Sequence, residues 1–283
     1  MEDRVHRAIS ADGTEIIGRV QGRGPPLVLV HGSLEDGDLC WASLVPRLRE
    51  RFTCYTMSTR CRGDSGAHPD VSPGRLVQDV TAFVESIGEP VRLVGESAGG
   101  MLALGAAARS GAVAAVAAYE PVVFEVLPEE EGKRLEQTIE RVREVAADGR
   151  LADAARAFAE PLVNDDELDA ISASDYFETS GRYVPVLLEE MAQANQARGY
   201  SPTDPAVLER IVRPVLLMRG ERTAFSRWFG EGVMHVARHV PDAQVLEIAG
   251  AGHWGPILAP EPIAEELLRF FEAAPEPHSV SDR

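Results

Sequence analysis

Ser97, with a glycine two residues before it and another two residues after it, is the candidate nucleophile of this sequence. A short apolar run at 91–94 leads into Gly-Glu-Ser-Ala-Gly at 95–99, and an alanine-rich helical stretch follows. A serine at a sharp strand-to-helix turn is strained, and the residues two before and two after it must be small so that strand and helix can approach each other. We therefore predict that Ser97 is a nucleophile. The main-chain amide of Ala98, at the start of the helix, would then help to hold an oxyanion.

A histidine late in the chain is the candidate general base. His253 lies in the glycine-rich run 249–254, after the last strand-like segment and before a helical segment at 260–271. This places it at the carboxyl edge of a sheet, where ligands bind in open α/β folds, and it follows the serine in chain order as the turn motif requires. We predict that His253 accepts the Ser97 proton and that Trp254 lies beside the substrate.

A second oxyanion donor is expected after the apolar run 26–30, where the sequence reads His-Gly-Ser at 31–33. The loop after the third strand supplies this donor in proteins with the same serine turn, so we assign it to the amide of Ser33. We interpret His31 as a structural histidine, held by hydrogen bonds beneath the site.

Six short, mostly apolar runs must position these side chains. They cover 26–30, 53–57, 91–94, 113–117, 214–218 and 244–248, and longer segments separate them. Strands of a parallel sheet covered on both faces have this pattern, because neither face meets water. An opening hairpin is expected at 5–9 and 15–21, around a turn at 11–13. The sequence thus predicts an α/β fold with a mostly parallel central sheet and helices on both faces.

Residues 121–206 interrupt this alternation with charge-rich helical segments and no strong strand. We interpret them as a helical cap over the sheet edge, and 1–120 with 207–273 as the core. The cap could gate the site and exclude water, or it could be a packed subdomain without a gating role. Its aromatic and methionine side chains suggest an apolar pocket wall, with Tyr183 and Met191 as substrate-binding candidates. Residues 274–283 are predicted to be a disordered tail.

The composition argues against several other functions. A net charge of −17 is unfavourable for binding nucleic acid, because phosphate contacts rely on basic residues. Three cysteines without a Cys-x-x-Cys pair argue against a disulfide framework and a thiolate metal site, and His235 with His239 lacks a third ligand nearby in the sequence. We expect no metal and no cofactor.

The localisation follows from two missing patterns. The N-terminal sequence has no signal-peptide pattern, and no apolar run reaches the roughly 18 residues that span a bilayer. We therefore expect a cytoplasmic protein without a membrane partner. The oligomeric state stays open, with a homodimer as one alternative.

Four motifs together resemble the α/β-hydrolase superfamily. They are His31-Gly32 with Trp41, Arg-Gly-Asp-Ser at 62–65, the turn at 95–99, and Ala-Gly-His-Trp at 251–254. The resemblance extends from about Pro26 to Phe271 and implies the α/β-hydrolase fold for nearly the whole chain. It says less about the reaction, because similar proteins hydrolyse esters, lactones, amides or carbon–carbon bonds.

The sequence departs from the family's pattern at the acid of the catalytic triad. The family usually has an aspartate where this chain has Thr223, and a hydroxyl cannot supply the negative charge that orients the histidine. Glu120, at the end of the strand after the nucleophile helix, is the replacement that we favour. The pattern there resembles fungal zearalenone lactonases, which use a glutamate at this position. Glu221 and an incomplete triad remain alternatives.

Together these residues predict a serine hydrolase that cleaves a carboxylic ester or lactone of an apolar small molecule through an acyl-enzyme. One alternative is a cofactor-independent lyase or cyclase, in which Ser97 and His253 only move protons. The other is a small-molecule-binding protein that keeps the fold and has lost catalysis. The glycine-flanked serine argues against a loss of catalysis, because a protein without catalytic activity would have no physical reason to keep a strained backbone turn.

Overall fold

The computed structural model describes residues 4–196 and 200–273, so the tail predicted at 274–283 lies outside the described residues. Eight strands form one sheet in the order β1-β2-β4-β3-β5-β6-β7-β8. Their bounds are β1 (Arg4–Ile9), β2 (Glu15–Gly22), β3 (Pro26–Val30), β4 (Thr53–Met57), β5 (Val91–Glu96), β6 (Val113–Tyr119), β7 (Val215–Gly220) and β8 (Gln244–Ile248). Strands β1 and β2 form the predicted antiparallel hairpin, and β3 to β8 run parallel to one another. The predicted mostly parallel sheet is confirmed.

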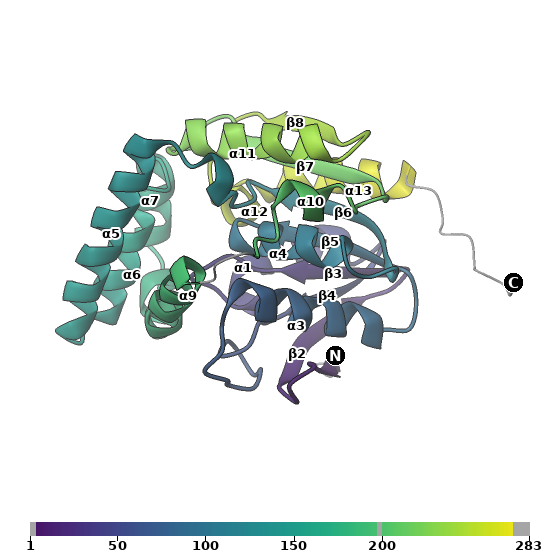
Figure 1. The fold of residues 1–283 in the computed structure, drawn as a ribbon, viewed down its shortest axis with the longest axis horizontal. Helices are drawn as coiled ribbons and strands as arrows, with labels where there is room; N and C mark the ends of the chain where they lie inside the picture. The colour runs from purple at the N-terminus through teal and green to yellow at the C-terminus, as the bar shows by residue number, and fades with distance from the viewer. Residues whose placement is uncertain (1–3, 197–199, 274–283) are drawn as a thin grey trace, which may run out of the picture.

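Helices cover both faces of this sheet, and each face has its own apolar core (Figure 1). On one face lie α3 (Pro73–Ser86), α4 (Ala98–Ala107), α10 (Pro205–Leu208) and α11 (Ser226–His239). On the other lie α1 (Gly37–Trp41), α2 (Val45–Leu48) and α13 (Pro260–Ala273), with the short α12 (Gly255–Leu258) preceding α13. Strands β3 and β5 are buried along their whole length, which explains why β3 is wholly apolar and β5 mostly so, without a regular alternation of polar residues.

The segment between β6 and β7 is helical, and most of its helices gather at one end of the molecule, at left in Figure 1. It contains η1 (Phe124–Val126), α5 (Glu129–Ala147), α6 (Leu151–Ala159), α7 (Asp165–Ser172), α8 (Tyr176–Ser180), η2 (Gly181–Tyr183) and α9 (Val184–Gln196). These helices form a third apolar cluster, to which the core contributes Leu34 and Trp254. The insertion therefore packs against the two core loops expected to carry the chemistry. Its role as a gate stays a prediction.

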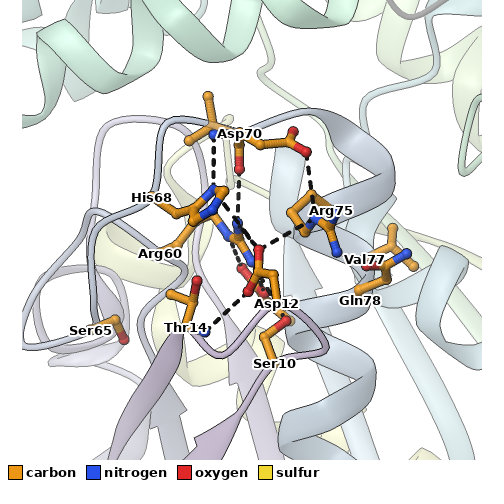
Figure 2. A network of polar contacts seen from close by, with 12 residues as sticks. Ser10, Asp12, Thr14, Arg60, Ser65, His68, Asp70, Arg75, Val77 and Gln78 are labelled. Atoms are coloured by element: carbon orange, nitrogen blue, oxygen red, sulfur yellow. Dashed lines mark hydrogen bonds and ion pairs between the residues drawn. The ribbon is translucent and has the colours of Figure 1, made fainter.

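A buried arginine in the β4–α3 connection, Arg60, ties this connection to the β1–β2 turn and to α3 (Figure 2). Both the Nε and Nη2 atoms of Arg60 lie 2.6 Å from the Asp79 carboxylate, and Nη1 lies 2.8 Å from Asp12 Oδ2. Nη1 also donates to the carbonyl of Asp70 at 2.9 Å. This guanidinium is fully buried, yet each of its three nitrogens has an acceptor, so its charge is compensated.

Within 4–196 and 200–273, none of the helices has both the length and the apolar composition needed to cross a bilayer. The structure therefore offers no helical membrane span among these residues.

Candidate active site

Ser97 sits at the turn between β5 and α4 in a strained conformation. Its φ of 52° and ψ of −120° are unfavourable for a residue with a side chain, and it is the N-cap residue of α4. The flanking glycines explain how the turn is possible. A Cβ atom on Gly95 would lie 2.2 Å from the carbonyl of Gly99, and one on Gly99 would lie 2.2 Å from the carbonyl of Val30. Strand, turn and helix thus leave no space for larger residues at either position.

His253 lies on the loop after β8, and its ring is held from two sides. Its Nδ1 atom is 2.7 Å from Oε2 of Glu120, and both side chains are buried. The Phe229 ring, from α11, stacks on the imidazole with centroids 4.5 Å apart. A carboxylate on Nδ1 fixes the tautomer with a free Nε2, which is the atom that a general base needs.

Glu120 follows β6 and reaches His253 across the neighbouring strand β7, to which β6 is paired. Its φ of 44° is strained for a glutamate, and its side chain is fully buried. The other carboxylate oxygen, Oε1, accepts hydrogen bonds from the amide of Gly220 at 2.8 Å and from the hydroxyl of Thr223. Thr223, which occupies the family's usual acid position, therefore donates to the glutamate that contacts the histidine.

Glu221, the alternative acid, is placed differently. Its side chain is exposed and accepts the amide of Gly250 at 2.9 Å, rather than contacting His253. Of the two glutamates considered, Glu120 alone bonds the imidazole.

Two contacts that the sequence analysis missed hold the histidine loop. The Tyr119 hydroxyl donates to the carbonyl of Gly252 at 2.6 Å, and Oε1 of Glu167 accepts the amide of Trp254 at 3.0 Å. Glu167 also closes a capping box with Asn164 at the start of α7. The Asn-x-x-Glu spacing could have indicated the helix start, but the contact with Trp254 depends on how the insertion packs. Burial raises the pKa of Glu167, opposed chiefly by the nearby His253.

The two predicted oxyanion donors are both free. Among the described residues, neither the main-chain amide of Ser33 nor that of Ala98 has a hydrogen-bond partner. They line one small cavity together, and Ser33 also lines the cavity that contains Ser97. Unpaired amides at a helix N-terminus favour negative charge, so they could receive an oxyanion.

His31 lies beneath this loop, hydrogen-bonded as the sequence analysis expected. Its Nδ1 is 2.7 Å from the carbonyl of Gly32, and its Nε2 accepts the amide of Thr59 at 3.0 Å. Burial, assisted by the charge of Arg62, lowers the pKa of His31 to about 4. A neutral, fully bonded imidazole fits a structural role.

Ser97 lines one cavity, which shares Ser33 with a second cavity, and the second shares part of its wall with a third. The Ser97 cavity, of about 30 Å³, has a wall built from both the core and the insertion. It is lined by Ser33, Leu34, Glu35, Glu96, Ser97, Phe158, Ala159, Leu162, Val163, Tyr176, His253 and Trp254. The Ala98 cavity, of about 50 Å³, lies on the other side of Ser33. It shares Pro73, Met101, Phe124, Met191 and Ala194 with an outer cavity of about 580 Å³.

The three predicted substrate-binding residues do not lie in one cavity. Trp254 lines the Ser97 cavity, and Met191 lines the Ala98 and outer cavities. Tyr183 lines none of these three; its hydroxyl contacts Asp36 and accepts the amide of Gly63 at 3.2 Å. Tyr183 thus braces the insertion against the core loops, which leaves it without a place in the pocket wall.

Two buried carboxyl groups, of Glu35 and Glu96, line the Ser97 cavity, and the sequence analysis did not predict that they would lie together. Glu35 is 2% exposed and Glu96 is 3% exposed. Burial raises the pKa of Glu96 well above its usual value, and the charges of Glu35 and Glu120 reinforce this. Burial also raises the pKa of Glu35, although the Tyr176 hydroxyl opposes the shift. Glu35 lies in the loop after β3 and Glu96 is the last residue of β5, so no local sequence pattern could have linked them.

These carboxyl groups and Cys40 form the one set of potential metal ligands found among the described residues. One ligand atom from each of Glu35, Cys40 and Glu96 lies within 4.8 Å of the others. Metal binding at such a site would require a thiolate, but burial raises the pKa of Cys40 well above its usual value. The donor set therefore fits a metal ion poorly.

Comparison with known proteins agrees with this architecture. Residues 27–266 match the model of the Alpha/beta hydrolase family. The chain is 31% identical to a pimeloyl-acyl-carrier-protein methyl ester esterase of Xanthomonas campestris, covering 90% of this chain and 98% of that protein. It is 29% identical to the esterase of the same name from Stenotrophomonas maltophilia, over 91% and 96% of the two chains.

Solved structures show the same fold. An alpha/beta hydrolase from Sphaerobacter thermophilus superposes with a TM-score of 0.73 at 28% identity, covering 94% of this chain and all of that one. A thermophilic esterase from Thermogutta terrifontis superposes with a TM-score of 0.74 at 21% identity, over 95% and 98% of the two chains. Because the family model matches residues 27–266, most of its length, the chain belongs to the alpha/beta hydrolase family.

Proposed function

We propose that this protein is a serine esterase that cleaves carboxylic esters of apolar small molecules through an acyl-enzyme at Ser97. The observation that carries the proposal is the 2.7 Å contact between Glu120 and Nδ1 of His253, in a site where His253 and Ser97 line the same cavity. A buried acid–histidine pair next to a strained serine is the arrangement that activates a hydroxyl for acyl transfer. The esterase names of the relatives from Xanthomonas and Stenotrophomonas support the same reaction class.

The proposed reaction uses the side chains of Ser97 and His253, which line one cavity, and two main-chain amides. Nε2 of His253 takes the proton of the Ser97 hydroxyl while Oγ attacks the ester carbonyl carbon, and the carbonyl oxygen becomes an oxyanion. The free amides of Ser33 and Ala98 donate to that oxygen. The imidazolium then gives its proton to the departing alkoxide, and water, deprotonated by the same histidine, releases the acid from Ser97.

The cavities favour an ester with one small and one larger part. The Ser97 cavity, of about 30 Å³, accepts only a small group. The Ala98 cavity opens toward the outer cavity and is mainly apolar, with Met101 and Met191 in its wall. Methionine side chains adapt to different apolar shapes, so we expect tolerance for chain length on this side. Lactones, which join the two parts in a ring, are a second class to assay.

The first experiment measures hydrolysis of short- and medium-chain nitrophenyl esters and of macrolactones by wild type, Ser97→Ala, Glu120→Gln and Glu221→Gln. We expect wild type to turn over the esters and Ser97→Ala to lose activity. Glu120→Gln should lower kcat by up to about 10⁴-fold, the effect of neutralising a triad acid. Glu221→Gln, the matched control at an exposed carboxylate, should retain activity.

Three results would contradict the proposal in different ways. Equal losses in Glu120→Gln and Glu221→Gln would remove the special role of Glu120. Ester turnover that survives Ser97→Ala would show that hydrolysis does not pass through an acyl-enzyme at Ser97. Absence of turnover together with resistance of Ser97 to a fluorophosphonate would favour a binding protein, because only an activated serine reacts quickly with that reagent.

A further inference from the structure

We propose that Glu35 and Glu96 form a subsite for an ammonium group of the ester, so that the preferred substrates of this protein are amino esters. The inference rests on the proposed esterase function, which it extends to a substrate class. It starts from the Ser97 cavity, in which both carboxyl groups line the wall beside the nucleophile.

The first argument is that neither carboxyl group has a basic partner. Among residues 4–196 and 200–273, no lysine or arginine forms an ion pair with Glu35 or Glu96; the only cationic candidate is His253, whose Nε2 lies 3.6 Å from Oε1 of Glu96. Buried carboxylates are normally paired, because burying an unpaired charge is costly. Among the described residues, no lysine or arginine would therefore compensate the two carboxyl groups in their ionised form.

The second argument is that one carboxyl oxygen of Glu35 has no hydrogen-bond donor. Oε1 of Glu35 accepts the Tyr176 hydroxyl at 2.7 Å, whereas Oε2 is buried and has no hydrogen-bond partner. The Gly32 amide and the Cys40 thiol favour the ionised Glu35 from nearby, without closing a hydrogen bond to Oε2. A buried acceptor left unpaired costs stability, and a donor on a ligand would recover that cost.

The backbone brings the two carboxyl groups together at Gly32. A Cβ atom on Gly32 would lie 2.1 Å from Oε2 of Glu96 and 3.4 Å from Oε2 of Glu35. The absence of a side chain at Gly32 lets the Glu96 carboxyl group lie against the backbone, where one of its oxygens and one of Glu35 lie within 4.8 Å of each other. An ammonium group has three donors and could bond to both at once.

Two further aromatic residues belong to the mainly apolar remainder of the cavity wall. Tyr176 and Trp254 line it, and their ring centroids lie 5.0 Å apart. Aromatic faces attract ammonium ions, most strongly where water is excluded. The cavity of about 30 Å³ has room for roughly two groups of the size of water, which suits a primary ammonium rather than a bulky quaternary one.

The test compares two esters that differ only in this group: alanine benzyl ester and benzyl propionate. At pH 7 the amine of the alanine ester is largely protonated, because α-amino groups have pKa values near 7.7–8.0. Release of benzyl alcohol gives kcat/KM for both esters with wild type, Glu35→Gln, Glu96→Gln and the control Glu221→Gln. We expect wild type to prefer the alanine ester by at least about tenfold, and each of the two cavity variants to lower that ratio about tenfold or more. Glu221→Gln, which removes the same charge from an exposed position, should leave the ratio unchanged.

A second measurement is independent of turnover. Calorimetric titration of Ser97→Ala with alanine benzyl ester should show binding, and the double variants Ser97→Ala/Glu35→Gln and Ser97→Ala/Glu96→Gln should bind it at least about tenfold more weakly. Thermal unfolding of each variant shows that it is folded. The two glutamine variants carry the test separately, so a folding failure in one leaves the other.

The outcomes separate this inference from the proposed function. Hydrolysis of both esters without preference, or a preference that survives both glutamine variants, overturns the ammonium subsite and leaves the esterase. Failure to hydrolyse either ester, with binding that depends on Glu35 and Glu96, overturns the esterase and retains the subsite. Failure of both hydrolysis and binding overturns both.

Discussion

Two buried clusters of charge in this molecule are built on opposite principles. Around Arg60, a fully buried guanidinium meets Asp79 and Asp12, and its charge is compensated within the chain (Figure 2). In the Ser97 cavity, Glu35 and Glu96 are almost as deeply buried and have no lysine or arginine partner among the described residues. Compensated charge holds elements together, whereas uncompensated charge is a cost that folding alone does not explain. The difference is the reason why we propose that the second cluster binds a ligand.

The largest expected effect comes from breaking the compensated cluster. Arg60→Met would leave Asp79 fully buried without its bidentate partner. We expect the free energy of unfolding to fall by about 3–5 kcal/mol, because removing one member of a buried pair strands the other charge. Urea unfolding measures this loss. The double variant Arg60→Met/Asp79→Leu should recover part of it, and a loss below about 1 kcal/mol in the single variant would show that water replaces the arginine.

The Glu120 carboxylate is also buried, but hydrogen-bond donors within the chain stabilise its charge. Thr223→Val would remove one of its donors while keeping the side-chain shape. Hydrogen bonds to charged groups contribute about 1.5–3 kcal/mol, so we expect kcat/KM to fall roughly 10- to 100-fold. Thr223→Ser, which retains the hydroxyl, is the matched control and should stay close to wild type. Equal activity of the valine and serine variants would mean that Gly220 alone suffices to hold Glu120.

Removing a carboxyl group from the Ser97 cavity should stabilise the protein, whereas removing Arg60 should destabilise it. Folding raises the pKa of Glu96 above its usual 4.5, so above that pH the native chain holds more protons than the unfolded chain. Wild-type stability should therefore fall as the pH rises from about 4.5. Glu96→Gln lacks this penalty and should be more stable than wild type at pH 8, by on the order of 1 kcal/mol, whereas the two should converge near pH 4. Urea unfolding at pH 4, 6 and 8 tests this, and a difference that is constant with pH would contradict it.

An exposed ion pair gives the smallest expected effect and the baseline for the comparison. Lys133 and Glu129 pair at 2.6 Å on α5, with side chains 65% and 82% exposed. Lys133→Gln should change the free energy of unfolding by only about 0.3–0.5 kcal/mol, because water screens such pairs. The change should shrink further in 1 M salt. A larger effect would show that α5 depends on its surface charges more than on its apolar face.

The sequence by itself determined the features that depend on local spacing. Glycines at 95 and 99 allow only a tight turn at Ser97, and the apolar runs without alternation require a sheet covered on both sides. Thr223 at the family's usual aspartate position indicated that His253 must find its acid elsewhere, and Glu120 was the favoured candidate. The predicted sheet was confirmed because the pattern of a buried strand is complete within the strand itself, whereas the roles of Ser97 and Glu120 stay predictions.

Only the tertiary structure decided which side chains meet. Glu120 could be told from Glu221 only when β6 and β7 were aligned, because the two residues differ in burial and direction rather than in chemistry. The support of the histidine loop by Glu167 depends on where the insertion packs. The approach of Glu35 and Glu96 at Gly32 depends on how the loop after β3 lies against the end of β5. Residues so far apart in the chain carry no common spacing, and the physical cause of their properties, burial in a shared cavity, exists only in the folded molecule.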